Sequence, residues 1–229
     1  MRETPLAGIR VAYGGWIKMH KVVMCLALFC PVAGQAEEVV IAALGDSLTQ
    51  GYGLVETEGF VPQLQRWLEA VGTDVQLINA GVSGDTTAGG LSRAAWTLTP
   101  EVDAMIVALG GNDLLRGIDP EVSRANLEGI LRAAAAAEVE VLLVGMQAPG
   151  NYGPAYKQAF DAMYPELSET YGTLFAPSFF EGLRIEEGDP ASVRAFMQPD
   201  GIHPNADGVV RIVEALGPYA LDLIARVEK

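Results

Sequence analysis

The feature that most constrains the fold is a regular alternation of short apolar segments with longer amphipathic ones, from residue 39 to the C-terminus. The short segments are rich in Val, Leu and Ile without polar alternation, which is typical of parallel strands buried on both faces. The longer segments carry apolar residues at spacings of three and four, and several begin near a proline, as helices do. This pattern predicts an α/β fold, a three-layer α/β/α sandwich with a parallel sheet of roughly five strands.

The expected elements can be placed on the sequence. Strands are predicted at residues 39–44, 75–80, 104–109, 139–145 and 173–176. Helices are predicted at residues 60–71, 86–98, 120–137, 154–171 and 205–227. In such a sheet ligands bind outside the carboxyl ends of the strands, so reactive residues should be sought in the loops there.

The first 36 residues differ from the rest of the chain. Basic residues precede a short apolar run at 22–30, and small residues follow it at 34–36. This order is typical of a signal peptide, and the run is too short to span a bilayer as a stable helix. We therefore expect a signal peptide at 1–36, one domain at 37–229, and an exported protein, periplasmic or secreted, without a membrane anchor. Translation could start at Met1 or at Met19.

The numbers of cysteines and histidines exclude several kinds of site. Cys25 and Cys30 are the only cysteines, and both lie in the expected leader, so the mature protein would have neither a disulfide nor a thiol nucleophile. His20 also lies there, which leaves His203 as the only histidine of the mature chain. A histidine-rich zinc site is therefore excluded, whereas a carboxylate site for magnesium or calcium is not.

Charge argues against a nucleic-acid partner. The chain has 15 basic and 29 acidic residues, and removing 1–36, with four basic residues and one acidic residue, leaves 11 and 28, a net charge of −17. A surface this acidic repels phosphate backbones and anionic lipid surfaces. The charge says nothing about the reaction.

A possible nucleophile follows the first predicted strand, in Gly45-Asp46-Ser47-Leu48. A serine hydroxyl is a weak nucleophile until a base takes its proton, and only His203 can supply a neutral imidazole to Ser47. Asp200 precedes His203 by three residues, a spacing that in a tight turn lets its carboxylate meet one ring nitrogen while the other faces the serine. The sequence therefore predicts a catalytic triad of Ser47, Asp200 and His203.

Attack on an ester carbonyl also places negative charge on its oxygen, which needs hydrogen-bond donors arranged in advance. The available donors near the strand ends are the backbone N–H groups of Ser47 and Gly84 and the side-chain amide of Asn112. Glycine allows close approach of the backbone, and an amide donates without titrating. We therefore expect Ser47, Gly84 and Asn112 to form an oxyanion hole.

Each feature also has an ordinary structural interpretation. Gly-Asp-Ser is a common turn, residues 84–86 could be a helix N-cap, residues 112–113 a cap or turn, and His203 a surface histidine. Three further carboxylates are interpreted as capping or loop-fixing groups: Asp46, Asp85 and Asp113. Independent accidents would not, however, place every component of one mechanism at the same end of one sheet.

Taken together, these blocks resemble those of the SGNH (GDSL) hydrolase superfamily, and the chain is similar to its exported thioesterase, protease, arylesterase and lysophospholipase subfamily. The resemblance covers essentially the whole mature chain, with matching blocks at 45–48, 84–86, 110–113, 151–153, 164–165 and 200–204. It implies a flavodoxin-like sheet and a serine esterase acting on acyl, aryl or thio esters without a cofactor. It also implies the roles given above to Ser47, Gly84, Asn112, Asp200 and His203.

The same resemblance implies that the loop at 114–119 closes over the acyl chain and helps to set the preferred chain length. Leu114 departs from the small residue expected there, which leaves the preferred length open. Ordinary loop packing is an equal alternative for Leu114 and Leu115.

Two other functions fit parts of this pattern. A flavodoxin-like sheet could hold a nucleotide or flavin phosphate in the loop at 45–53, but this loop lacks a Walker lysine and the Rossmann glycine spacing. Such a binding protein would also leave Asp200 and His203 unexplained. A carbohydrate acetyl ester or a peptide would fit the same fold and triad. We expect a small-molecule acyl ester or thioester as substrate, no metal, no nucleic acid, and a monomer.

Overall fold

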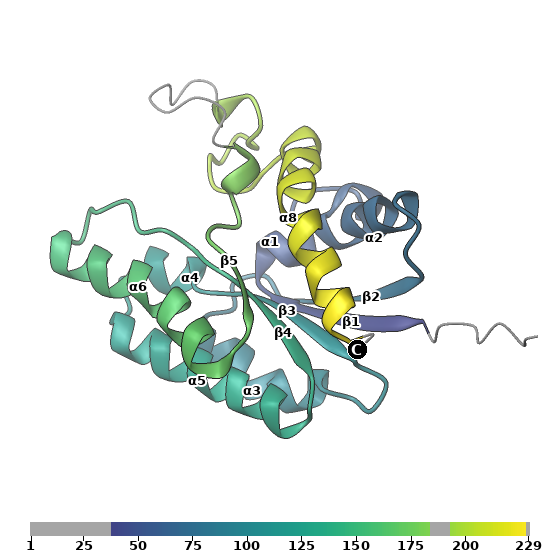
Figure 1. Cartoon of the computed structure of the whole chain (residues 1–229). Coiled ribbons are helices and arrows are strands. Elements are labelled where there is room, and N and C mark those ends of the chain that lie inside the picture. Colours follow the sequence, from purple (N-terminus) through teal and green to yellow (C-terminus); the bar gives the residue numbers. More distant parts are fainter. Residues whose placement is uncertain (1–37, 184–192, 228–229) are drawn as a thin grey trace, which may run out of the picture. The chain divides into compact units, whose positions relative to one another are not determined.

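The computed structural model describes residues 38–183 and 193–227 (Figure 1). The expected signal peptide at 1–36 lies outside these residues, so its assignment stays a prediction. In the two described ranges, no helix is both long and apolar enough to cross a membrane.

A parallel sheet of five strands forms the centre of the domain, in the order β2-β1-β3-β4-β5. Its strands are β1 (Val39–Gly45), β2 (Val75–Gly81), β3 (Ala104–Ala108), β4 (Glu140–Val144) and β5 (Leu174–Ala176). Each predicted strand is found, with ends that differ by no more than one residue. The sheet order is the flavodoxin-like one, and the predicted fold class is confirmed.

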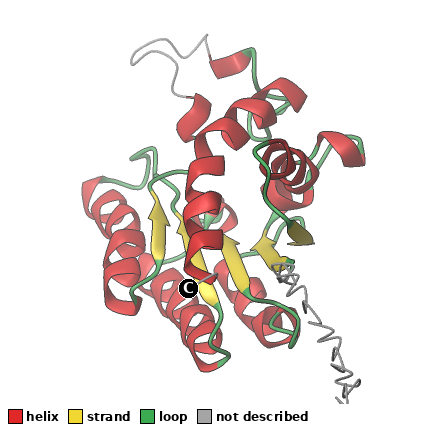
Figure 2. Cartoon of the chain, turned by 45° about the vertical axis from the view of Figure 1, so that its right-hand side comes forward, coloured by secondary structure: helices red, strands yellow, loops and turns green. Residues whose placement is uncertain are grey.

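Helices cover both faces of this sheet (Figures 1 and 2). One face carries α2 (Phe60–Ala70) and α8 (Ala206–Val227). The other face carries α3 (Thr87–Thr97), α5 (Pro120–Ala136) and α6 (Pro154–Tyr171). All five were predicted from their apolar spacing, and their buried stripes face the sheet as that spacing requires.

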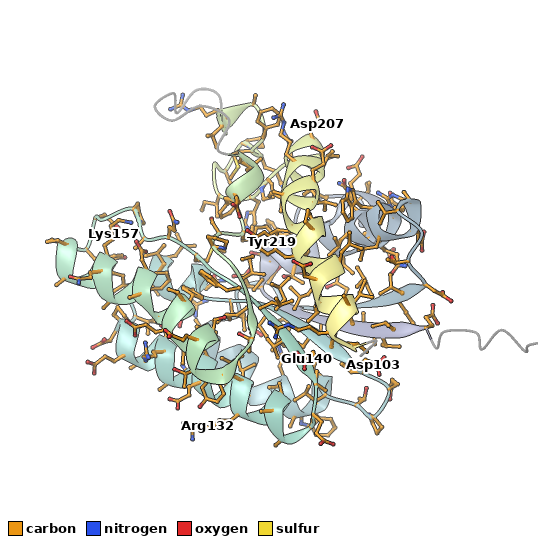
Figure 3. All side chains as sticks on the ribbon, viewed as in Figure 1. Asp103, Arg132, Glu140, Lys157, Asp207 and Tyr219 are labelled. Atoms are coloured by element: carbon orange, nitrogen blue, oxygen red, sulfur yellow. The ribbon has the colours of Figure 1, made fainter. Side chains whose placement is uncertain are left out.

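The core lies between these layers, and its largest contributions come from the central strands. Ile41, Leu44 and Ile106 are buried completely or almost completely, and Leu216 of α8 packs in the same apolar cluster. Burying one such side chain stabilises the fold by about 1.5–3 kcal/mol. Figure 3 shows side chains filling the space between the sheet and α8, whereas Arg132 and Asp207 lie at the periphery.

One expectation for the strands was wrong. All of the predicted strands were expected to be buried on both faces, but in β2 only Val75 is buried, and Gln76 and Asn79 are exposed. The reason is the position of β2 at the edge of the sheet, where solvent reaches the strand and its polar side chains remain hydrated. The first two residues of β5, at the opposite edge, are also only half-buried.

Short helices replace two of the expected loops. After β1 the chain turns directly into α1 (Ser47–Gln50), and shortly after β3 it enters α4 (Gly111–Leu115). Leu114 and Leu115, expected in a loop, therefore belong to the last turn of α4. Two 3₁₀ turns, Glu56–Glu58 and Glu181–Leu183, also lie in the described ranges.

Candidate active site

The predicted site residues gather at the carboxyl edge of the sheet, beside the ends of β1 and β3. From β1 the chain winds to β2 at one edge and then crosses back to β3 on the other side of β1. Such a reversal opens a crevice between the loops that follow the two central strands, and doubly wound sheets bind their ligands there. Ser47 follows β1 and Asn112 follows β3, so this topology brings together residues that are far apart in the chain.

Ser47 is the first residue of α1, and its position depends on the residues before it. Asp46 caps the helix, because its Oδ1 accepts a hydrogen bond from the Leu48 N–H at 3.0 Å. A Cβ at Gly45 would collide with the side chain of Thr49. Only glycine therefore lets the strand turn so tightly into the helix, which presents Ser47 at the edge of the sheet.

The three residues of the predicted triad are hydrogen-bonded in series. Ser47 Oγ lies 2.9 Å from His203 Nε2, and His203 Nδ1 lies 2.7 Å from Asp200 Oδ2. Asp200 Oδ1 accepts from the backbone N–H groups of Ile202 at 2.9 Å and His203 at 3.0 Å. The bond to the His203 ring, helped by these two, lowers the pKa of Asp200 to about 2. Asp200 is thus ionised at neutral pH and can hold the imidazole with Nε2 turned to the serine.

Tyr52 and Gln198, which the sequence did not indicate, hold the loop that carries His203 through hydrogen bonds and a ring contact. Gln198 donates its backbone N–H to His203 O at 2.7 Å and its side-chain amide to Tyr52 O at 2.8 Å. The Tyr52 ring packs against the imidazole with a centroid separation of 4.7 Å. No local pattern reveals these contacts, because Tyr52 and Gln198 are separated by 146 residues.

Gly84 occupies the third position of a tight turn from Val82 to Asp85. The Asp85 N–H donates to Val82 O at 3.1 Å, and Gly84 has φ +83° whereas Ser83 has no positive φ, which makes the turn type II. A type II turn flips its central peptide relative to type I, and only a residue tolerant of positive φ permits this. Glycine at position 84 therefore permits this direction of the Gly84 N–H.

Asn112 lies in the first turn of α4, after Gly110, whose φ is +120°. A Cβ on Gly110 would collide with the hydroxyl of Tyr164, which donates to Leu109 O at 3.0 Å. The Asn112 Nδ2 donates one proton to Asp46 Oδ2 at 3.1 Å. An amide nitrogen carries two protons, so the second remains available to a substrate oxygen.

The three other carboxylates act as the sequence interpretation expected, as capping and loop-fixing groups. Asp46 is buried, and burial raises its pKa to about 6. Asp85 forms an ion pair with Arg93, with Nε and Oδ2 separated by 2.7 Å. Asp113 is fully buried and accepts bonds from the Thr87 N–H at 2.8 Å and the Thr87 hydroxyl at 2.6 Å. This last pair ties α4 to the start of α3.

A cavity of about 710 Å³ opens beside Ser47. Ser47, Gly84, Asn112 and His203 all line it, which brings the nucleophile, the base and the predicted oxyanion donors to one space. Most of the remaining wall is apolar and includes Leu48, Tyr52, Leu114, Leu115, Met146, Pro149, Phe180, Leu183, Val193, Met197 and Ile202. In the part of the chain that the structure describes, no group of three or more His, Cys, Asp or Glu side chains could hold a metal ion.

Comparisons with known proteins identify relatives of this chain. The model of the GDSL-like Lipase/Acylhydrolase family matches residues 43–210. Esterase TesA of Pseudomonas aeruginosa is 39% identical over 201 residues, which cover 87% of this chain and 96% of that protein. Thioesterase 1/protease 1/lysophospholipase L1 of Escherichia coli K12 is 34% identical over 83% of this chain and 86% of its own length.

Solved structures similar to this chain include esterases. The crystal structure of TesA superimposes with a TM-score of 0.72 and 37% identity, covering 80% of this chain and 99% of that one. The crystal structure of AlinE4, an SGNH-hydrolase family esterase, superimposes with a TM-score of 0.67 and 41% identity, covering 82% and 97%.

Proposed function

Because the chain belongs to the GDSL-like lipase/acylhydrolase family, we propose that it hydrolyses acyl esters and thioesters through a covalent acyl-enzyme on Ser47. The chain is a serine hydrolase of ester bonds; the residues that carry the reaction and the range of substrates are our proposal. The observation that carries it is the hydrogen-bonded series of Ser47, His203 and Asp200 beside an apolar cavity.

The first half of the reaction forms the acyl-enzyme. His203 Nε2 takes the proton of Ser47 Oγ while this oxygen attacks the substrate carbonyl carbon, and the carbonyl π electrons move to the oxygen. The ionised Asp200 stabilises the imidazolium that results. The oxyanion accepts bonds from the Ser47 N–H, the Gly84 N–H and the free proton of the Asn112 amide. When the intermediate collapses, the leaving alcohol or thiol takes the proton from His203.

Water completes the cycle in the second half of the reaction. His203 removes a proton from water as it attacks the acyl carbon, the same donors hold the second oxyanion, and Ser47 Oγ recovers its proton on leaving. Every group required is a side chain or backbone amide of this chain, so the proposed mechanism uses no cofactor.

The cavity supports an acyl group as the part of the substrate that is recognised. Leu114 and Leu115 line it, in agreement with a role beside the acyl chain. Leu114 also packs against the core, whereas Leu115 is exposed. An apolar wall of this size selects by burial rather than by hydrogen bonding, so discrimination between chain lengths is expected to be modest per methylene. Broad arylesterase, thioesterase and lysophospholipase activity fits such a site, with a small-molecule ester as the substrate.

We also propose that residues 1–36 are a signal peptide and that 37–229 is the hydrolase domain, exported to the periplasm or secreted. Support comes from the basic, apolar and small-residue order of the leader. N-terminal sequencing of the protein recovered from the cell envelope or the medium tests this, and an intact N-terminus there would contradict it.

Labelling and substitution test the reaction itself. An organophosphonate should modify Ser47 and abolish activity, and Ser47→Ala should remove ester hydrolysis without loss of fold, because the hydroxyl contributes little to packing. A folded Ser47→Ala variant with nearly wild-type activity, or labelling at another residue, would show that the assignment is wrong. A panel of acyl esters and thioesters of increasing length then defines the substrate range.

A further inference from the structure

Arg116 lies immediately after α4 and reaches across to the turn that carries Gly84. Its Nη2 donates to the Gly84 carbonyl oxygen at 2.8 Å, a contact between residues 32 positions apart. Arg116 and Asn112 are four positions apart, so they lie on the same side of this helical turn. One short helix thus presents an amide to the cavity and a guanidinium to the neighbouring turn.

The turn at Gly84 needs such support. Val82, Ser83 and Gly84 are exposed, and a Cβ built on Gly84 would meet nothing within 4 Å except the Arg116 guanidinium. Packing therefore does not brace this residue, and glycine is the residue with the widest choice of backbone conformations. The flanks are tied, because Val82 N–H donates to Gly45 O at 3.0 Å and Ser83 Oγ bonds to the Gln50 side chain.

From this geometry we propose that Arg116 is a positioning residue of the oxyanion hole, which fixes the direction of the Gly84 N–H by holding the Gly84 carbonyl. The proposal rests on the proposed function, since it concerns the donors of that reaction. Arg116 does not touch the reacting atoms. Its bond holds the Gly84–Asp85 peptide, while the contacts of Val82 and Ser83 hold the preceding residues. Together they limit φ and ψ of Gly84, so that its N–H points to the oxyanion position before the oxyanion forms.

This role has a kinetic signature. An oxyanion donor acts on charge that exists in the transition state and hardly in the bound ester, so misdirecting it lowers kcat and leaves KM nearly unchanged. If Arg116 instead bound an anionic part of the substrate, its loss would raise KM. Loss of general stability would lower the amount of active enzyme and the unfolding midpoint together.

The test uses Arg116→Ala and Arg116→Lys in the full chain, with Arg124→Ala as the matched control. Arg124 pairs with Glu166 through Nη1 at 2.6 Å, neither residue lines the cavity beside Ser47, and the loss of Arg124 changes the charge equally. Arg116→Ala should lower kcat about 10-fold, less than the loss of a donor itself, with KM within about twofold. Guanidinium ion at a concentration that does not unfold the enzyme should restore part of this loss in Arg116→Ala and none in the control.

Arg116→Lys, which keeps the charge but has a shorter reach and no planar fork, should fall between wild type and Arg116→Ala. If Arg116→Ala fails to fold, the kcat of Arg116→Lys decides the matter. A kcat within about twofold of wild type, a loss confined to KM, or no recovery with guanidinium would overturn the proposal. If those results come with an inactive Ser47→Ala enzyme, only the role of Arg116 is wrong. An active Ser47→Ala enzyme would instead remove the proposed function.

Discussion

Asp46→Asn is the substitution whose effects on stability and activity should have opposite signs. Asp46 is 1% exposed, and its carboxylate accepts bonds from the Leu48 N–H and the Asn112 amide. Burial raises its pKa from 3.8 to about 6 despite both bonds, which favour the ionised form. Above pH 6 the folded protein therefore holds a buried negative charge that the unfolded chain would expose to water.

The magnitude follows from the difference between the two pKa values. Roughly two units correspond to about 3 kcal/mol of unfolding free energy at 1.36 kcal/mol per unit. The pKa of Asp46 is higher in the folded than in the unfolded state. Its contribution to the unfolding free energy is therefore fully present below pH 3.8, where Asp46 is protonated in both states, and is lost as the pH rises through 6. Asparagine has no such titration and is an equally good N-cap. The unfolding free energy of Asp46→Asn, relative to that of the wild type, should thus rise by up to about 3 kcal/mol between pH 4 and pH 7.5.

Activity should change in the other direction. The asparagine side chain at position 46 must accept from the Leu48 N–H with its oxygen, which leaves its NH₂ group facing the NH₂ group of Asn112. Two donors cannot bond to each other, so the Asn112 amide should rotate and turn its oxygen toward position 46 or move away. Loss of one oxyanion donor costs about 10²- to 10³-fold in kcat. We therefore expect a variant that is more stable at neutral pH and much slower.

Urea unfolding of both proteins from pH 4 to pH 7.5, with kcat measured in parallel, gives the comparison. Asp222→Asn, at an exposed position of α8, is the control for the change in charge. The informative quantity is the difference in unfolding free energy between variant and wild type, because other titrating groups cancel in it. A difference that does not depend on pH would refute the destabilising burial of Asp46, and unchanged kcat would refute its control of Asn112.

Other substitutions test the remaining contacts. Asn112→Ala should lower kcat roughly 10²-fold with a smaller change in KM, and a loss in KM alone would make Asn112 a ground-state binding residue. Gly84→Ala should also lower kcat, because alanine disfavours the positive φ of the type II turn, and an unchanged kcat would contradict the assigned donor. Asp200→Asn should be much slower, because it removes a charge that stabilises the imidazolium, and nearly unchanged kcat would contradict the role of Asp200. Asp200 carries this charge at neutral pH, since its pKa is about 2.

Much of the fold and the site could be predicted because each depends on a signal that is local or countable. The central strands are short apolar runs without alternation, and the flanking helices have a clear apolar spacing, so both were placed nearly to the residue. A single histidine in the expected mature chain left His203 as the only possible base, and the structure brings it within 2.9 Å of Ser47.

The features that were missed have no such signal. One-turn helices such as α1 and α4 are too short to show an apolar period. The apolar residues of a strand do not reveal whether it lies at the edge or in the centre of a sheet, because this depends on which strands pair with it. Gln198 and Arg116 act through hydrogen bonds to backbone carbonyls of distant segments, at Tyr52 and Gly84. Any residue type offers a backbone carbonyl, so nothing in the partner's identity reveals such a bond.

Two residues that are unfavourable for stability, Asp46 and Gly84, fix the direction of hydrogen-bond donors in the proposed oxyanion hole. A buried aspartate at 46 destabilises the folded state at neutral pH, yet an ionised carboxylate can only accept, and it therefore requires that Asn112 present its NH₂ group and not its oxygen. A neutral amide at position 46, whose oxygen must accept from the Leu48 N–H, would present its NH₂ group and so favour the reversed orientation of Asn112. Glycine at 84 loses more conformational entropy on folding than other residues, yet it alone adopts φ +83° readily. At both positions the residue with the higher cost is the one that leaves a single orientation of the donor, and the rate of the reaction depends on that orientation.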